Sequence, residues 1–594
     1  MKYIHRTLAA ALLSGVVMAT SPSMTPAFAE TLTVTDVLVG ESVYAITIPK
    51  IEVVDGNISE ADIRSLFKGE DPTGLSAKLA TWNAASITIP EFSFKQTFND
   101  ADGAPQTVEV IYKGLTIDSL ENGVAKSSRI EGGELKTSGP NAANGTFGAF
   151  TTGLFDFGAL MAFYVGGGEK TGDMRTVYKD IAFDGMTLTG PEGFKCEIGK
   201  FAAAEFKARP MEISFLELAT LAESMNGERE PTADELAKFV GFYKDIFTGI
   251  ESSPSTFSGF DCRFPDERGR PVTFVVGEVT VDAFGNARYP AITMNNMNVT
   301  IEGDGFVKLG KVTFKGMELG GIFEAIEAAG DQLSPAWFET NYRKVIPAVL
   351  GFGIEGVDID VPDSADPTQR VKGKIGKFDV TLGNHVLGIP TDISIVSEHT
   401  VVDIPENTTD ENFKQLRALG YSTIDVGATV KLKWDEAAGT ISVDEASMTG
   451  ENMGTVNISG LIGNAGKDLF AEDPGTMQGA AMGLSVKALT LAAEDTGIAG
   501  KIFELVAKEQ GGTADAIRGQ VSGMAAGMIP MVLGGTEQAQ QVANAVMTFL
   551  NGGTSLTISA EAKDPAGIGL ADFMAAQENP AVLAEKVNLS AEAK

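Results

Sequence analysis

The chain has 594 residues, of which 43% are apolar and 21% charged, a balance that allows a large buried core and excludes a disordered acidic tail. Its formal net charge of -33 argues against nucleic acid and anionic lipid headgroups as partners. A chain of this length has room for roughly three or four domains, or for one long body built from repeats.

The N-terminal segment has the pattern of a cleavable export signal. Lys2 and Arg6 are followed by an apolar stretch over residues 8–18 and by small residues that end in Ala-Phe-Ala at 27–29. This order is typical of a secretory signal peptide. We therefore expect residues 1–29 to be removed and the mature chain to work in the periplasm, with the outside of the cell as the alternative. No later stretch reaches the roughly 20 apolar residues that a membrane-spanning helix needs, so no transmembrane segment is expected in the mature chain.

Three segments read as strands that contain a proline: residues 46–53, 87–94 and 387–395. On either side of Pro49 and Pro90, apolar and polar residues alternate as in a strand with one buried face. Proline has no N–H to donate to a β-ladder. We therefore expect these strands at a sheet edge, or with a bulge at the proline.

A second pattern, apolar-x-(Gly/Asp/Asn)-apolar-x-apolar, recurs along the chain. It occurs at residues 112–117, 178–183, 294–299 and 354–359. A follower of the form apolar-Gly-Lys stands after the last three, at residues 198–200, 309–311 and 375–377. This recurrence predicts a β-hairpin that is repeated at least three times.

Helices are expected between the hairpins. Ser59 and Thr232 each precede acidic residues, which is a helix start signal. Further helices are predicted near residues 74–83, 155–166, 212–225, 319–329 and 335–348.

The clearest strand covers residues 424–434, where apolar residues alternate with polar residues and one glycine. Period-two alternation predicts an antiparallel strand with one buried and one wet face. A turn at residues 435–439 leads into a second strand at 441–443, which completes a hairpin.

After residue 491, Ala, Gly and Met dominate the composition. Thr513 and Thr536 are good N-cap candidates. Helices are predicted near residues 499–510, 514–532 and 536–550, ahead of a strand at 555–560.

These patterns predict an α+β, β-rich fold. Repeated antiparallel hairpins form one long or several curved sheets with inserted helices, and the C-terminal part is helical. The expected domains follow the signal peptide at 1–29: β-hairpin repeats with inserted helices at 30–210, a second β-repeat region with helical insertions at 211–400, and an antiparallel sheet with Ala/Gly/Met-rich helices at 401–594.

Cys196 and Cys262 are the only cysteines, and both follow a Gly-Phe-x sequence. In an oxidising compartment a disulfide between them is the default expectation, and two free, buried thiols are the alternative. Closing a loop of this length would stabilise the fold by roughly 4 kcal/mol in the chain-entropy model.

Motifs for catalysis are missing. His385 and His399 are the histidines that remain after the signal peptide, and neither lies in a motif with a nucleophile. We read both as structural histidines in strands. The sequence contains no nucleophile elbow, phosphate-binding loop or paired Cys-x-x-Cys metal site. No catalytic residue and no cofactor is therefore nominated, which favours a protein that is not an enzyme.

An acidic cluster offers a weak candidate for a metal site. Its members are Asp358, Asp360, Asp363 and Asp366, at the end of a predicted strand. Alternation places Asp358 and Asp360 on the same outward face, where their carboxylates could hold calcium. In so negative a chain, an acidic and solvated strand face is the plainer interpretation, and we prefer it.

The signal peptide, the recurring hairpins, the Lys-Leu-Lys-Trp-Asp strand end at 431–435 and the closing strand at 555–560 resemble exported β-repeat proteins of Gram-negative envelopes, such as the AsmA-like and YdgA-like families. The resemblance covers residues 40–560 and implies a β-rich envelope protein of poorly defined function. It carries over no functional residue.

The leading hypothesis is a non-enzymatic periplasmic envelope protein. A helix-covered sheet would bind a lipid or another apolar small molecule, and envelope proteins are the other expected partners. One alternative is a secreted structural or adhesive repeat protein. Another is a carboxylate-based hydrolase, for which no acid pair is singled out.

Overall fold

The computed structural model describes residues 30–40, 44–57, 59–66, 72–99, 105–139, 142–165, 172–213, 217–218, 221, 231–363 and 369–594. The predicted signal peptide at 1–29, Asp366 and most of the helix expected at 212–225 lie outside these residues. The chain divides into two compact units, unit 1 with Met1–Gly303 and Gly316–Pro347, and unit 2 with Asp304–Lys315 and Ala348–Lys594. The domain ranges expected from the sequence stay a prediction.

Unit 1 is built on an antiparallel sheet with helices inserted between strands. Its strands are β1 (Thr31–Gly40), β2 (Tyr44–Val54), β3 (Ala84–Asn99), β4 (Pro105–Glu121), β5 (Val124–Ile130), β6 (Gly132–Ser138), β7 (Asn144–Phe147), β8 (Phe150–Thr152), β9 (Leu154–Asp156), β10 (Arg175–Phe183), β11 (Met186–Thr189), β12 (Lys195–Ile198), β13 (Phe201–Ala208), β14 (Ile250–Ser252), β15 (Ser255–Phe257), β16 (Phe260–Pro265), β17 (Pro271–Val276), β18 (Glu278–Val281), β19 (Arg288–Tyr289), β20 (Ile292–Ile301) and β22 (Met317–Glu318). Its helices are α2 (Glu60–Leu66), α3 (Pro72–Leu79), α4 (Phe157–Val165), α6 (Ala233–Gly249), α7 (Gly320–Ala329) and α8 (Pro335–Thr340), with 3-10 turns η2 (Pro191–Gly193), η3 (Gly330–Gln332) and η4 (Tyr342–Val345).

The main core of unit 1 lies between strands β1 to β4 and helices α2, α3 and α4. Ile51, Ile87 and Ile117 of the sheet are almost fully buried, together with Ile63 of α2 and Phe157 of α4. The buried apolar residues of these strands belong to one cluster with those of the helices, so one face of the sheet is buried under the helices.

A crease crosses the strands of unit 1. β4 pairs with β6 over residues 107–113 and with β5 over residues 116–121. From β4 onward the sheet therefore continues as two series of shorter strands, which we call the two arms. The arms meet again on β20, which pairs with both β17 and β18. The glycines along this line, which we call the crease glycines, are Gly114, Gly132, Gly148, Gly185, Gly199, Gly259 and Gly277. At Gly259, φ is +73° and a Cβ would lie 1.7 Å from the carbonyl oxygen of Val276, so no other residue fits.

The second sequence pattern marks residues with positive φ inside strands. These are Gly114 (64°), Asp180 (50°), Asn296 (54°) and Gly356 (65°). Such residues bend a strand as a β-bulge does. The recurring pattern therefore marks a strand irregularity, and the hairpin repeat stays a prediction.

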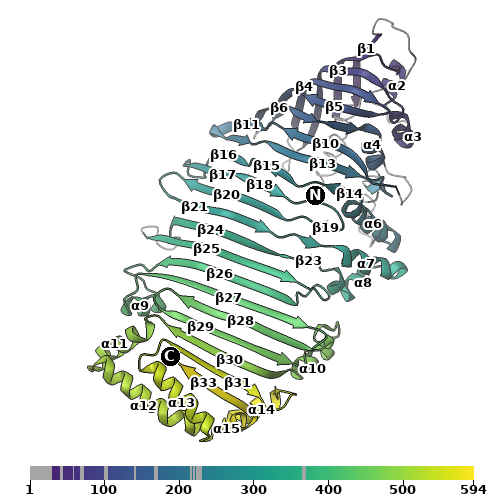
Figure 1. Cartoon of the computed structure of the whole chain (residues 1–594). Coiled ribbons are helices and arrows are strands. Elements are labelled where there is room, and N and C mark those ends of the chain that lie inside the picture. Colours follow the sequence, from purple (N-terminus) through teal and green to yellow (C-terminus); the bar gives the residue numbers. More distant parts are fainter. Residues whose placement is uncertain are drawn as a thin grey trace. The chain divides into compact units, whose positions relative to one another are not determined.

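Unit 2 is an antiparallel sheet whose neighbours mostly follow chain order (Figure 1). Its strands are β21 (Gly305–Phe314), β23 (Ala348–Val349), β24 (Gly351–Pro362), β25 (Arg370–Gly383), β26 (Asp392–Asp403), β27 (Thr423–Asp435), β28 (Thr440–Gly450), β29 (Gly454–Gly463), β30 (Ser485–Asp495), β31 (Ser555–Ala562), β32 (Ile568–Gly569) and β33 (Val587–Ala593). Its helices are α9 (Glu411–Ala418), α10 (Pro474–Met482), α11 (Ile498–Gln510), α12 (Ala514–Val532), α13 (Glu537–Leu550), α14 (Leu570–Glu578) and α15 (Ala581–Lys586), with the 3-10 turn η5 (Lys467–Phe470).

The predicted fold class is confirmed: the chain is α+β and β-rich, with antiparallel pairing and a helical C-terminal part. The helix start signals are also right, because Thr232 and Glu235 form a capping box at α6. Thr513 and Thr536 cap α12 and α13 through their side chains.

The proline-containing strands differ in part from expectation. β2 and β3 are interior strands, so an edge position is wrong for them. Their mutual pairing is interrupted between Thr47 and Glu52, around Pro49, as a missing donor requires. Pro390 lies in the turn before β26 and not within a strand.

Candidate functional site

The apolar side chains of unit 2 gather on one side of its sheet. Along β27 the apolar residues within 424–434 share one side, because successive strand residues point to opposite faces. Val430 lies directly across from Ile395 on β26 and Ala446 on β28. The same side therefore stays apolar from strand to strand, as the alternation predicted. We call it the apolar face.

The apolar face is exposed over β28, β29 and β30. Met448 is 67% exposed, Val456 48%, Ile458 42%, Leu489 47% and Leu491 38%. Met448 lies directly across from Val456, and Ile458 from Leu491. These five side chains thus form one continuous surface, which we call the exposed patch. Contiguous exposed apolar surface marks interaction sites far more often than scattered apolar residues do.

The same face is covered beyond β30. Helix α13 packs on β31 and β33. Leu556 of β31 is buried, and so are Val542 and Ala543 of α13. Leu556 lies directly across from Ala493 of β30. The part of the apolar face that α13 covers therefore begins at β31, the strand next to the one that carries Leu491. The C-terminal helices therefore close part of the apolar face and leave the exposed patch open.

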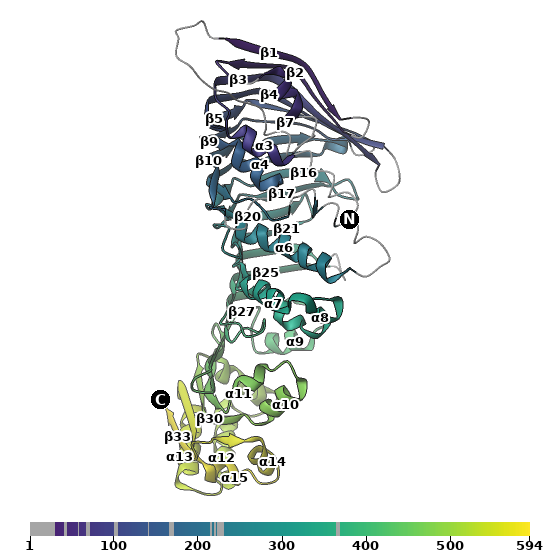
Figure 2. The same cartoon turned by 90° about the vertical axis from the view of Figure 1, so that its right-hand side faces the viewer.

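Helical segments flank the apolar face at both strand ends. At the end of β27, the rings of Trp434 and Phe470 of η5 are 4.7 Å apart, and the Trp434 indole N–H donates to the Ala465 carbonyl. Before the start of β27, Tyr421 is buried, and Nζ of Lys501 in α11 lies 3.4 Å from its ring centroid. Figure 2 shows that α9 and α10 lie on one side of the sheet, the same side for both. The exposed patch lies between the helical segments at the two strand ends.

The opposite face of the same strands is polar. Lys431 and Glu445 lie directly across from each other, with 2.8 Å between Nζ and Oε2. The hydrogen bond from Lys431, and then that from Ser447, lowers the pKa of Glu445. Asn457 stands between Val456 and Ile458 and so belongs to this polar face. The sheet is amphipathic, with charge on one side and the exposed patch on the other.

The acidic cluster does not come together as a metal site. Asp358 lies on β24 between Lys308 and Lys374 of the neighbouring strands. The hydrogen bond from Arg370 lowers the pKa of Asp360, which is also 3.5 Å from Lys372. Among the residues that the structure describes, no three His, Cys, Asp or Glu side chains are grouped as a metal would require. Asp363 follows β24, where its backbone N–H donates to the carbonyl of Gln369.

Cys196 and Cys262 are joined by a disulfide, as the sequence predicts. They lie directly across from each other on β12 and β16 in unit 1. A groove of about 600 Å³ is lined by five of the crease glycines, from Gly148 to Gly277, and its carboxylates are Asp184, Glu197 and Asp261.

Each of these carboxylates is paired with a cation. Lys200 pairs with Asp184 at 2.9 Å, and Lys195 pairs with Glu197 at 2.5 Å. Arg263 lies 3.4 Å from Asp261. Because each carboxylate of this open groove already has a cationic partner, we do not assign chemistry to the groove.

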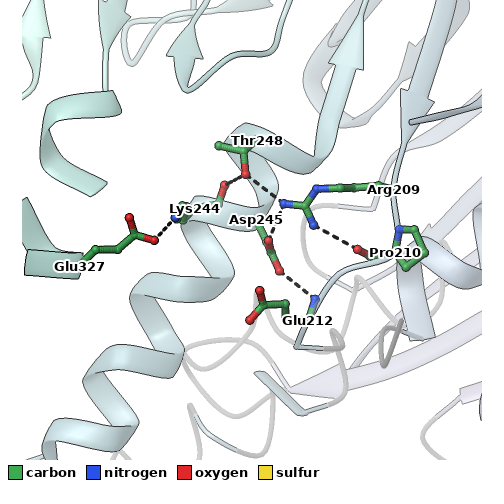
Figure 3. Close-up of polar contacts among 7 residues, drawn as sticks. All are labelled: Arg209, Pro210, Glu212, Lys244, Asp245, Thr248 and Glu327. Carbon is green, nitrogen blue, oxygen red and sulfur yellow. Dashed lines mark hydrogen bonds and ion pairs between the residues drawn. The ribbon is translucent and has the colours of Figure 1, made fainter. Parts of the chain in front are cut away.

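One buried ion pair lies elsewhere in unit 1 (Figure 3). Arg209, just after β13, donates to Asp245 of α6 at 2.7 Å. The second oxygen of Asp245 accepts the backbone N–H of Glu212 at 2.8 Å. Lys244, one residue earlier, pairs with Glu327 of α7. Both carboxylate oxygens of Asp245 thus accept hydrogen bonds from other residues of the chain. The Arg209–Asp245 pair, which we call the clamp, joins α6 to the end of β13.

The two histidines lie apart from these features. His385 stands in the turn region between β25 and β26, so its predicted strand position is wrong. His399 is in β26 with a φ of 52°, and its Nδ1 lies 3.1 Å from Asp425. The hydrogen bond with Asp425 raises the pKa of His399. The ring is 77% exposed, which suits a surface ion pair at a strand irregularity.

No residue of the exposed patch was singled out from the sequence. The signal that would have found it is the alternation in β29, where Val456 and Ile458 flank Asn457. Alternation shows that one side is apolar but does not show whether a helix covers it.

A family model described as "Uncharacterized protein" matches residues 447–594, which is about a quarter of the chain. The match begins within β28 and includes the exposed patch and the C-terminal helices. No curated protein and no solved structure is significantly similar to the chain. Within the described part of the chain, every helix is too short or too polar to cross a membrane.

Proposed function

We propose that the chain is an exported periplasmic envelope protein without catalytic activity, which binds a lipid or a similar apolar ligand on the exposed patch. The exposed patch is the observation that carries this proposal. Five large apolar side chains remain in water there, although helices cover the adjoining part of the same face. Covering a half-exposed side chain of this size with an apolar ligand would contribute roughly 1 kcal/mol.

Charge narrows the class of ligand. The net charge of -33 repels anionic headgroups. The members of the exposed patch carry no charge, and the cation Lys501 of the flanking helix α11 lies over the ring of Tyr421. A neutral or zwitterionic lipid therefore suits the site better than an anionic one.

A pair of neighbouring substitutions tests the site. Ile458→Lys places a charge in the exposed patch, whereas Asn457→Lys places the same charge on the polar face one residue away. We expect Ile458→Lys to weaken binding of a fluorescent neutral acyl probe by about tenfold or more, because a charge under an apolar ligand loses its water. Asn457→Lys should bind like the parent chain. Equal affinity of both variants, with matching thermal unfolding, would contradict the proposed site.

The natural ligand can be sought directly. Mature protein from Glu30 onward would be purified from the periplasm without detergent, and solvent extracts would be analysed by mass spectrometry beside an unrelated acidic exported protein. A lipid enriched in stoichiometric amount supports the proposal. A folded protein without bound lipid would favour the structural or protein-binding alternative.

A further inference from the structure

Exposed methionines are concentrated in unit 2. The large apolar residues that are at least 38% exposed include Met448, Met477, Met482, Met524, Met528, Met531 and Met574. Six of these lie on helices α10, α12 and α14, and Met448 lies on strand β28. Exposure governs how readily a thioether is oxidised, so these side chains are the accessible ones.

Met448 has a special position among them. It is the only methionine in the strands that the structure describes in unit 2. Among the members of the exposed patch it is the most exposed, at 67%. Its direct neighbours across the ladder are Ala428 and Val456, and the small alanine leaves the thioether accessible from one side. The rest of the patch consists of Val, Ile and Leu, which do not undergo this chemistry.

Oxidation would change the polarity of the exposed patch at this one position. Hydrogen peroxide transfers one oxygen atom to the sulfur, which is oxidised by two electrons to a sulfoxide, while the peroxide is reduced to water. The sulfoxide oxygen is a strong hydrogen-bond acceptor. A ligand that covered it would remove its water without offering a donor, which disfavours binding.

We propose that Met448 is a site of reversible oxidation and that its sulfoxide releases the apolar ligand from the exposed patch. This inference rests on the proposed function. Methionine sulfoxide reductases reverse the modification, so the exposed patch would switch between a binding and a non-binding state.

The test uses the full mature chain and the neutral acyl probe. Peroxide is added in steps, peptide mass spectrometry reports the added oxygen at each methionine, and probe affinity is measured in parallel. We expect affinity to fall about tenfold as Met448 is oxidised and to recover after treatment with methionine sulfoxide reductases. Met448→Leu is compared with its own unoxidised state, and peroxide should leave its affinity for the probe unchanged.

Met574→Leu is the matched control, because Met574 is 63% exposed on α14 and is not a member of the exposed patch. This variant should lose affinity on oxidation as the parent chain does. If Met448→Leu loses affinity equally, or if Met448 resists peroxide while Met574 reacts, the inference is wrong. If the unoxidised parent does not bind the probe at all, the proposed function fails as well.

Discussion

Asp245 illustrates how a single buried charge is made tolerable. Its side chain is 7% exposed, and that of Arg209 is 16% exposed. A charge this far from water is stable only when paired and hydrogen-bonded, and Asp245 has the guanidinium on one oxygen and the Glu212 N–H on the other. Removing one partner leaves the other buried without compensation.

We predict that Asp245→Asn destabilises unit 1 by about 3 kcal/mol, because it leaves the Arg209 charge without its counterion. Chemical unfolding followed by circular dichroism measures this change. Glu327→Gln is the control in the same cluster, since Glu327 is 61% exposed and its pair with Lys244 is expected to matter by less than about 0.5 kcal/mol. Similar losses in the two variants would argue against the clamp.

At the scale of elements, the disulfide ties two strands that are far apart in sequence. β12 and β16 are adjacent in the sheet although Cys196 and Cys262 are 66 residues apart. Between them the chain first forms β13 of the sheet, then forms α6, and returns to the sheet through β14 and β15. The disulfide therefore restrains the two ends of the segment between Cys196 and Cys262, at the place where the crease separates the two arms of the sheet.

We predict that replacing both cysteines by serine lowers the stability of unit 1 by about 4 kcal/mol, since a long loop of the unfolded chain is no longer closed. Urea unfolding with and without reductant measures the effect. Reductant should destabilise the parent chain and leave the serine variant unchanged. A serine variant as stable as the oxidised parent would show that the strand pairing alone holds this region.

At the scale of the whole molecule, ion-paired carboxylates set the response to acid. Hydrogen bonds from Lys113 and Lys136 lower the pKa of Glu134 from its usual value to about 2. Ion pairs or hydrogen bonds also lower the pKa of Asp62, Asp266, Asp360, Asp473 and Asp572. A folded-state pKa below the unfolded one contributes stability that is present above the unfolded pKa and lost as pH falls through the folded pKa.

We predict that the unfolding temperature falls steadily as pH drops from about 4.5 toward 2, the window set by Glu134. Differential scanning calorimetry at stepped pH measures it. Glu134→Gln should lose less stability across this window than the parent chain. His399 acts in the opposite sense, because its raised pKa contributes stability below about 6.5 that is lost as pH rises.

Much of the architecture follows from local patterns in the sequence. Alternation in 424–434 predicted an amphipathic antiparallel strand, and Thr232, Thr513 and Thr536 predicted helix starts, because both signals depend on neighbouring residues alone. The disulfide followed from the presence of just two cysteines in a chain expected outside the cytoplasm.

Other features depend on residues that are distant in sequence. Pro49 and Pro90 sit in interior strands because partners on both sides tolerate a locally interrupted ladder. The exposed patch exists because α13 covers β31 and β33 and stops short of Ile458 and Leu491. The sequence by itself determined which sides of the strands are apolar, since that depends only on period two. Only the tertiary structure decided which part of that apolar side stays exposed, since this depends on where α13, which comes later in the chain, packs on the sheet.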